Sequence, residues 1–211
     1  MDIAIPIFDR LTALDAIGPY EVLSRLPGAE LRFVAKEAGP KRTDTGALGV
    51  HADLRLAELP APEVVLVPGG EGSRPLMRDP EVLDWLRAAH ETSAWTTSVC
   101  TGALVLGAAG ILDGKRATTH WAYLERLRGL GADPVTERVV EEDKVITAAG
   151  VSAGIDMALT LAGRIAGDEV AQAIQLGIEY DPEPPFDSGS PAKASPGVIE
   201  MVRAAEGTQS S

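Results

Sequence analysis

The sequence is poor in cysteine, since Cys100 is the only one in 211 residues. A single cysteine excludes an intrachain disulfide framework and any zinc module built on several cysteines. Lysine and arginine are also scarce: 19 basic residues stand against 31 acidic ones, without a basic cluster that could follow a phosphate backbone. We therefore expect neither a disulfide-stapled fold nor a nucleic-acid partner.

Long hydrophobic runs are missing as well. No stretch of about 18 uninterrupted apolar residues occurs, which argues against a membrane span. The opening segment MDIAIPIF has neither a basic region nor a long apolar core, so an export signal is not expected and we predict a cytoplasmic protein. The 45% hydrophobic and 24% charged residues are typical of a folded globule, and the length predicts one domain over residues 1–211.

Apolar runs and helical periodicity alternate along the chain. A continuous β-branched run at 63–70, stopped by proline and two glycines, is typical of a central strand buried on both faces. Alternating strands and helices predict a mostly parallel sheet with helices on both faces. The expected strands cover 3–8, 30–38, 63–70 and 94–99, with a hairpin over 135–150 that turns near Glu142 and Asp143; the expected helices cover 14–26, 80–91, 101–112, 119–130, 152–167 and 168–180, the last begun by an Asp168 cap.

The C-terminal segment differs in composition. Residues 181–196 are rich in proline, serine and glycine, and the following VIEMVRAAEG can form a short helix. We expect the tail over 181–211 to pack on the domain.

Two junctions between a strand and a helix have small residues on both sides of a possible nucleophile: Ser98–Gly102, around Cys100, and Gly150–Gly154, around Ser152. Such a sharp turn tolerates only small neighbours, and ligands of open α/β sheets bind beyond the carboxyl ends of the strands. The second junction matches the G-x-S-x-G pattern of serine hydrolases, but no histidine follows Ser152. Ser152 is therefore interpreted as a helix cap.

Cys100 is the stronger candidate for chemistry. At the start of a helix its sulfur would meet unpaired amides and the positive end of the helix dipole, which favour a thiolate. The alternative is a buried filler, because free cysteines are often buried. Asp15, just after the first strand, lies at the same edge of the sheet and could manage protons; its alternative role is a helix cap.

Several motifs together resemble the ThiJ/PfpI superfamily, relatives of the class I glutamine amidotransferases, and within it the isonitrile (isocyanide) hydratases. Their order and spacing span nearly the whole chain. The motifs are LDAIGPYEVL, VPGGEG, SVCTGALVLGAAGIL, ATTHW, AAGVSAGIDMAL and IEYDPEPPFDSGSP.

The resemblance implies a flavodoxin-like three-layer α/β sandwich, a homodimer, and a reaction without metal or organic cofactor. It also implies Cys100 as nucleophile, Asp15 as its acid/base partner and Thr101 beside them. The peptidase-like and glyoxalase-like branches often carry a histidine after the cysteine, where Thr101 stands here. An isonitrile hydratase that forms a covalent thioimidate is therefore the favoured hypothesis.

Other residues and functions are weighed beside this hypothesis. The backbone at Gly70 and Glu71 is a candidate oxyanion donor. The side chains of Glu21 and Glu71 can also face the pocket but are assigned no role, and His120 is interpreted as a packing or dimer residue. The alternatives are a glyoxalase or deglycase, a redox-sensing thiol, and the ligand-sensing domain of a transcription regulator. Only about 30 acidic, proline-rich residues follow Tyr180, which argues against an attached DNA-binding unit.

Overall fold

A seven-stranded sheet forms the centre of the computed structural model, which describes residues 1–208. The strand order is β10-β11-β7-β6-β1-β2-β5, and all neighbours are parallel except β10 and β11. The strands are β1 Asp2–Pro6, β2 Glu30–Ala35, β5 Leu54–Arg55, β6 Val64–Val67, β7 Trp95–Val99, β10 Val139–Glu142 and β11 Val145–Ala148. The expected mostly parallel sheet is confirmed.

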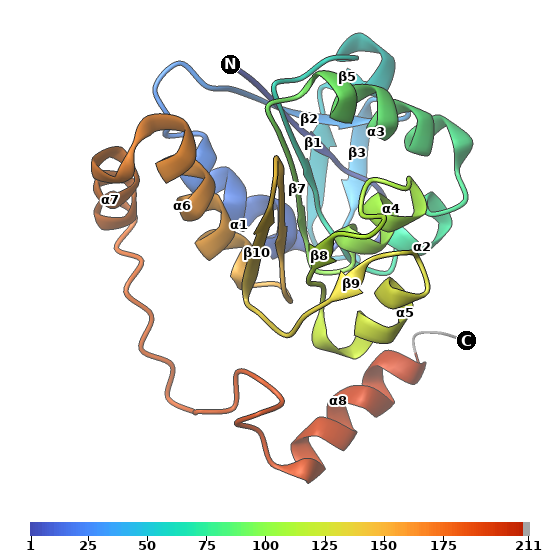
Figure 1. Cartoon of the computed structure of the whole chain (residues 1–211), viewed down its shortest axis with the longest axis vertical. Helices are drawn as coiled ribbons and strands as arrows, with labels where there is room; N and C mark the ends of the chain where they lie inside the picture. Colours follow the sequence, from blue (N-terminus) through green and yellow to red (C-terminus); the bar gives the residue numbers. More distant parts are fainter. Residues whose placement is uncertain (209–211) are drawn as a thin grey trace. The chain divides into compact units, whose positions relative to one another are not determined.

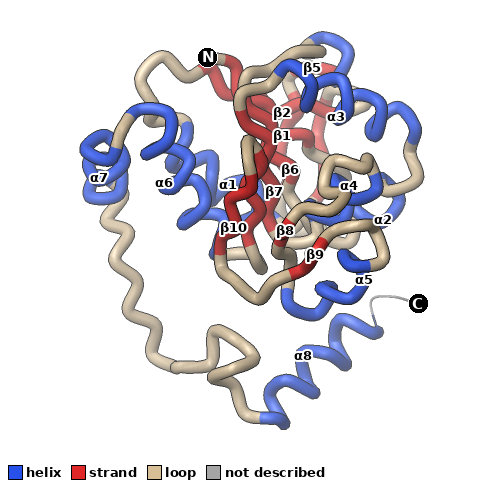
Figure 2. The backbone as a smooth tube through the Cα atoms, in the orientation of Figure 1, coloured by secondary structure: helices blue, strands red, loops and turns tan. Residues whose placement is uncertain are grey.

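Helices cover both faces of this sheet (Figures 1 and 2). On one face lie α1 Ala13–Leu23, α6 Ala153–Ala166 and α7 Asp168–Gly177; on the other lie α2 Ser73–Leu76, α3 Pro80–Thr92, α4 Gly102–Ala108 and α5 Leu124–Arg128. Successive residues of β1 point to opposite faces of the sheet. Ile3 and Ile5 pack in the core beneath α1, α6 and α7, and Ala4 packs in the core beneath α3, α4 and α5. The result is the expected three-layer sandwich.

The structure corrects several element boundaries. The second strand ends at Ala35, and a separate hairpin of β3 Gly39–Arg42 and β4 Gly49–Ala52 follows. The helix expected over 119–130 is a 3₁₀ turn, Trp121–Tyr123, joined to the short α5. Two further short strands, β8 Arg116–Ala117 and β9 Asp133–Pro134, pair beside it, and a 3₁₀ turn at Leu56–Glu58 follows β5.

The N-terminal ends of two helices, α3 and α7, differ in how they are capped. α3 begins at Pro80, and Asp79 before it caps the helix, since its side chain accepts a hydrogen bond from the Glu81 amide. Asp168 does not cap α7: it is the first helical residue, and Gly167, with φ +90°, holds the cap position. The hairpin turn near Asp143 is confirmed.

The C-terminal part, from Glu179, forms a separate compact unit and is described by itself. An irregular proline-rich segment leads into α8 Pro196–Thr208. The expected helix in this region is therefore present. The packing of the tail over 181–211 on the domain stays a prediction, as does the single domain over 1–211.

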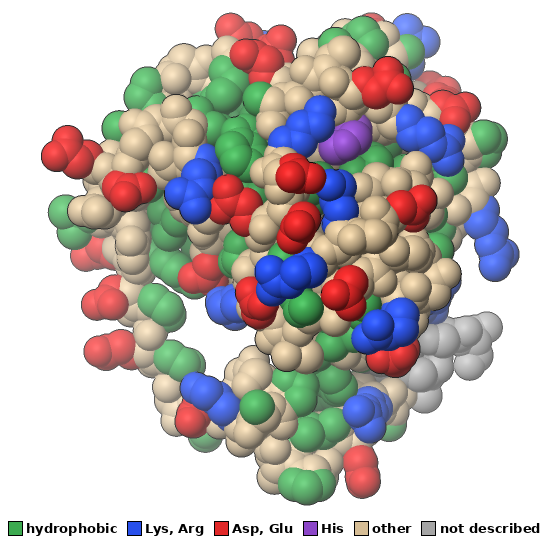
Figure 3. Space-filling model, in the orientation of Figure 1, with side chains coloured by type: hydrophobic (Ala, Val, Ile, Leu, Met, Phe, Trp, Pro, Cys, Tyr) green, Lys and Arg blue, Asp and Glu red, His purple; other side chains and the backbone are tan. Residues whose placement is uncertain are grey.

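Charged side chains of both signs are interspersed on the face drawn in Figure 3. Oppositely charged side chains form ion pairs at the surface of the protein, for example Arg138 with Asp156 and Arg164 with Glu141. Such a mixture is typical of a solvated surface rather than of a single-sign binding patch. Within residues 1–208, no helix is long and apolar enough to cross a membrane.

Candidate active site

Cys100 lies on a sharp turn between β7 and α4. Its φ of +56° places it in the left-handed region, which is uncommon for a residue with a side chain. The Cys100 amide donates to the carbonyl oxygens of Ala148 and Ala149 at 3.1 and 3.0 Å, and its carbonyl oxygen accepts from Thr119 Oγ1 at 2.8 Å. A Cβ at Gly102 would collide with the Val67 carbonyl. The small residues around Cys100 therefore reflect the tight packing of this turn.

Two backbone amides hold the sulfur of Cys100. The N–H groups of Thr101 and Val151 donate to it, and both lower the pKa of the thiol. Val151 has φ +34°, a strained conformation, at the start of the turn into α6. The second small-residue junction therefore supplies an amide to the cysteine at the first.

Asp15 faces this thiol from the first turn of α1 and is fully buried. Its Oδ2 accepts a hydrogen bond from the Gly69 amide at 2.9 Å, while Oδ1 has no hydrogen-bond partner among the described residues. Burial raises the pKa of Asp15 to about 7; the Gly69 amide and Cys100 oppose the rise, and Asp44 adds to it. Thr12, not Asp15, occupies the cap position of α1.

Burial also raises the pKa of the Cys100 thiol well above its usual value, and the Asp15 carboxyl group adds to the rise. Cys100 is 6% exposed. The expected helix-stabilised thiolate is corrected here, because the loss of hydration outweighs the two amide donors. Near neutral pH the thiol keeps its proton and the carboxyl group is close to its midpoint.

Thr101 connects the elbow to the turn after β6. Its Oγ1 accepts hydrogen bonds from the Gly70 amide at 2.9 Å and from Ser73 Oγ at 3.0 Å, and contacts the Gly70 carbonyl at 3.2 Å. A Cβ on Gly69 would lie 2.5 Å from the Thr101 nitrogen and 2.9 Å from Asp15 Oδ2. Glycine is needed there so that one turn can hold both Asp15 and Thr101.

Gly70 and Glu71 continue this turn. The Gly70 amide is already used by Thr101, so of the two predicted oxyanion donors only the Glu71 amide has no acceptor within the described part of the chain. The Glu71 side chain is nearly buried and forms an ion pair with Arg10, in the loop after β1. The oxyanion role of this backbone stays a prediction.

Three further residues considered in the sequence analysis, Glu21, Ser152 and His120, are not assigned to the site formed by Cys100, Asp15 and Thr101. Glu21 pairs with Arg25 at 2.8 Å. Ser152 occupies the cap position of α6, as predicted, but its side chain makes no capping hydrogen bond, and its Oγ accepts one from Arg138 at 3.3 Å instead. His120 packs so closely that a Cβ on Gly150 would lie 2.6 Å from its ring, which agrees with the packing interpretation.

The sequence pattern alone did not reveal four contributors: the Val151 amide, Gly69, Ser73 and Thr119. Gly69 and the Val151 junction had a visible signal, namely small residues directly after a buried strand. No group of three or more His, Cys, Asp or Glu side chains able to hold a metal ion occurs within the described chain. The site brings together a thiol, a carboxyl group of perturbed pKa and several amide donors, a set suited to nucleophilic and acid-base chemistry.

Comparison with known proteins assigns the class. The model of the DJ-1/PfpI family matches residues 1–164, and the chain belongs to this family. The predicted ThiJ/PfpI relationship is thereby confirmed. A ThiJ/PfpI family protein from Pseudomonas syringae has a similar structure, with a TM-score of 0.93 and 35% identity over 97% of this chain and 86% of that chain.

Two relatives with named functions give more specific comparisons than the family does. Isonitrile hydratase from Pseudomonas putida is 46% identical over 203 residues, which is 96% of this chain and 89% of that protein. The HTH-type transcriptional regulator CdhR of Pseudomonas aeruginosa is 30% identical over 172 residues, which is 79% of this chain but only 50% of the regulator. The first match extends along nearly the whole of both proteins.

Proposed function

We propose that the protein is an isonitrile hydratase, which converts an isonitrile into an N-substituted formamide. The observation that carries the proposal is the buried Asp15 carboxyl group, with a pKa of about 7, beside the Cys100 thiol. The 46% identity to an isonitrile hydratase over almost the full length supports the same reaction.

The first step joins the thiol to the terminal carbon of R–N≡C. Asp15, as carboxylate, accepts the thiol proton while the sulfur of Cys100 attacks, and then passes that proton to the same carbon. One S–H bond breaks, one S–C and one C–H bond form, and the product is the thioimidate R–N=CH–S–Cys100. The amides of Thr101 and Val151 stabilise the negative charge that develops on the sulfur during proton transfer.

Water completes the reaction. Asp15 removes a proton from water as its oxygen attacks the thioimidate carbon, and the nitrogen takes up a proton. The tetrahedral adduct then collapses to R–NH–CHO, and the sulfur leaves and is reprotonated. The net change is addition of one water molecule to the isonitrile, and neither an oxidant nor a cofactor is required.

Thr101 and the Gly69–Gly70 turn position this pair. Thr101 places its amide at the sulfur and its hydroxyl on Gly70, while the neighbouring Gly69 amide holds the carboxyl group. We therefore assign Cys100 and Asp15 as catalytic residues and Thr101 as the residue that orients them. The Glu71 amide is the proposed donor to charge on the substrate.

The assembly and location of the enzyme are proposals as well. We propose a homodimer in the cytoplasm, on the resemblance to ThiJ/PfpI proteins and on the sequence features given above. Light scattering coupled to gel filtration measures the mass in solution, and a monomer at micromolar concentration would contradict the dimer.

A turnover assay tests the activity. Purified protein is mixed with cyclohexyl isonitrile, and N-cyclohexylformamide is followed by liquid chromatography. We expect turnover by the wild type and none above background by Cys100→Ala. Equal rates with both proteins would exclude the cysteine mechanism, and no formamide with either protein would favour the sensing alternatives.

A further inference from the structure

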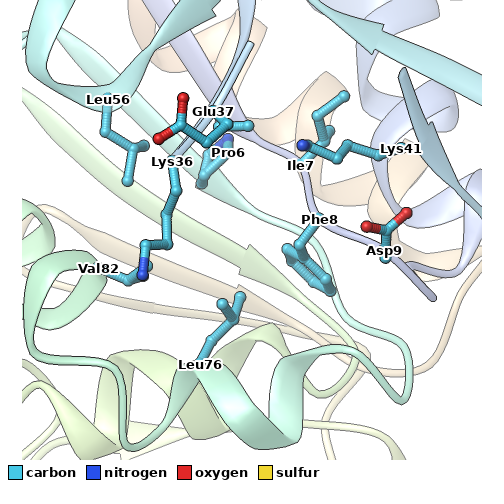
Figure 4. A pocket seen from close by; sticks show the side chains of 11 residues that line it. Pro6, Ile7, Phe8, Asp9, Lys36, Glu37, Lys41, Leu56, Leu76 and Val82 are labelled. Atoms are coloured by element: carbon cyan, nitrogen blue, oxygen red, sulfur yellow. The ribbon is translucent and has the colours of Figure 1, made fainter. Parts of the chain in front are cut away.

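A cavity of about 300 Å³ lies between the carboxyl ends of β1 and β2 and the residues Leu76 of α2 and Val82 of α3 (Figure 4). Its walls are mostly apolar and include Phe8, Leu56, Leu76 and Val82. Cys100, Asp15 and Thr101 do not line it. This volume is at the small end of the range for ligand sites, so the cavity suits a molecule smaller than a typical drug.

Two of the four charged residues around the cavity are already engaged by the protein. Lys36 forms an ion pair with Asp79 at 2.6 Å and lies 3.4 Å from Glu81. The Asp9 carboxyl group accepts a hydrogen bond from the Arg42 amide at 2.8 Å. These groups tie the loops after β1 and β2 to neighbouring elements and leave less capacity for a ligand.

Lys41 and Glu37 are different. Over residues 1–208 neither side chain has an ion-pair or hydrogen-bond partner, although both line the cavity. Figure 4 shows the Lys41 ammonium and the Glu37 carboxylate near Ile7 and Pro6, on the side of the cavity away from Leu76. Lys41 is half-buried and Glu37 is exposed, so both charged groups can be reached by a ligand in the cavity.

We propose that this cavity binds a free apolar α-amino acid. The carboxylate of the amino acid pairs with Lys41, its ammonium pairs with Glu37, and its side chain packs on Phe8 and Leu76. A ligand with a single charge would satisfy one of these two groups and meet a like charge at the other. A zwitterion with an apolar body complements both charges and the apolar walls.

The binding test uses the Cys100→Ala protein, so that it does not depend on the proposed enzymatic activity. Isothermal titration calorimetry compares L-phenylalanine with 3-phenylpropanoate, 2-phenylethylamine and glycine. We expect saturable binding of one L-phenylalanine per chain and, for each of the three analogues, affinity lower by about tenfold or more. Absence of saturable binding by L-phenylalanine, or equal affinity for 3-phenylpropanoate, would overturn the proposal.

Variants locate the site. Lys41→Met and Glu37→Gln, each in the Cys100→Ala background, should weaken L-phenylalanine binding by about tenfold or more. Lys115→Met is the matched control, because Lys115 pairs with Asp143 and does not line the cavity. Unchanged affinity in Lys41→Met, or an equal loss in Lys115→Met, would contradict this location.

Discussion

At the scale of single residues, Asp15 and Cys100 share one buried environment, and the pKa values of both are raised. Burial raises the pKa of the carboxyl group to about 7 and that of the thiol well above its usual value. Below pH 7 the pair holds two protons, and above it one proton remains for both groups. The one-proton state is the state that the proposed mechanism uses, since the carboxylate must first accept the thiol proton.

The raised pKa of Asp15 predicts how stability depends on pH. Between about pH 4 and 7 the folded state keeps a proton that the unfolded state has released, so stability falls as the pH rises through this window. At pH 8 the cost reaches about 4 kcal/mol, from a pKa difference of roughly three units. Asp15→Asn removes the ionisation and should lose less stability over the same window.

Urea unfolding of both proteins at several pH values between 4 and 8 measures this difference. The wild type should become less stable relative to Asp15→Asn as the pH rises, with the change complete shortly above pH 7. Two parallel curves would mean that Asp15 ionises in the folded protein as it does in water.

Thr101 gives a second residue-level prediction. Thr101→Val leaves the Gly70 amide and the Ser73 hydroxyl without their acceptor, which costs about 1 to 3 kcal/mol. Thr101→Ser keeps the hydroxyl and serves as the matched variant. We expect kcat/KM for cyclohexyl isonitrile to fall by about tenfold or more in the valine variant and by much less in the serine variant. Equal losses in the two variants would contradict the role given to the hydroxyl group, because the serine variant keeps it.

At the scale of elements, the long strands and helices could be predicted and the short ones could not. The run at 63–70 and the amphipathic pattern of α3 contain enough residues to define a period. The four-residue α2 and the two-residue β8 and β9 do not, and the hairpin β3–β4 is too short and polar to give a strand signal. Boundaries set by tertiary contacts, such as the end of β2, were also missed.

The candidate site could also be predicted only in part. Side chains with distinctive chemistry, Cys100 and Asp15, could be found from the sequence because parallel strands end at one edge of the sheet. The Val151 amide could not, because every residue carries the same backbone group and only its conformation aims it at the sulfur. The pKa values also required the structure, since burial decides them.

The Gly69 turn allows a prediction at the element scale. Gly69→Ala places a Cβ 2.5 Å from the Thr101 nitrogen, so the turn must move and the hydrogen bond to Asp15 is lost or lengthened. We expect isonitrile hydration to fall by about tenfold or more, in line with the cost of one charge-assisted hydrogen bond.

Gly177→Ala is the matched control for this change. Gly177 ends α7 and has nothing within 4 Å of the position of a Cβ, so alanine should leave turnover unchanged and slightly favour the helix. Turnover and circular dichroism of both variants provide the comparison. Full activity in Gly69→Ala would contradict the role given to the turn.

At the scale of the whole molecule, two sites lie at the same edge of the sheet. The thiol–carboxyl pair lies beyond the carboxyl end of β7, where α1 and α6 approach, and the apolar cavity lies at the carboxyl ends of β1 and β2, against α2 and α3. Membership of the DJ-1/PfpI family accounts for the fold, and the catalytic role of the first site is our proposal. The unpaired Lys41 and Glu37 at the second site give the molecule a separate binding function in our proposal.

The C-terminal tail carries the prediction at this scale. If residues 181–211 pack on the domain, as expected from the sequence, a chain ending at Tyr180 exposes apolar surface that the full chain covers. Its free energy of unfolding should then be lower, by roughly 25 cal/mol for each Å² of apolar surface uncovered. Urea unfolding compares the two chains, and identical free energies would show that the tail does not stabilise the domain.

The most direct test of the central claim is the mass of the protein during turnover. Wild-type protein is mixed rapidly with cyclohexyl isonitrile, quenched in acid, digested and analysed by mass spectrometry. The account predicts that the peptide with Cys100 gains the mass of one isonitrile before formamide is released, and that Cys100→Ala never does. Formamide produced by Cys100→Ala at the wild-type rate, without any adduct, would contradict it.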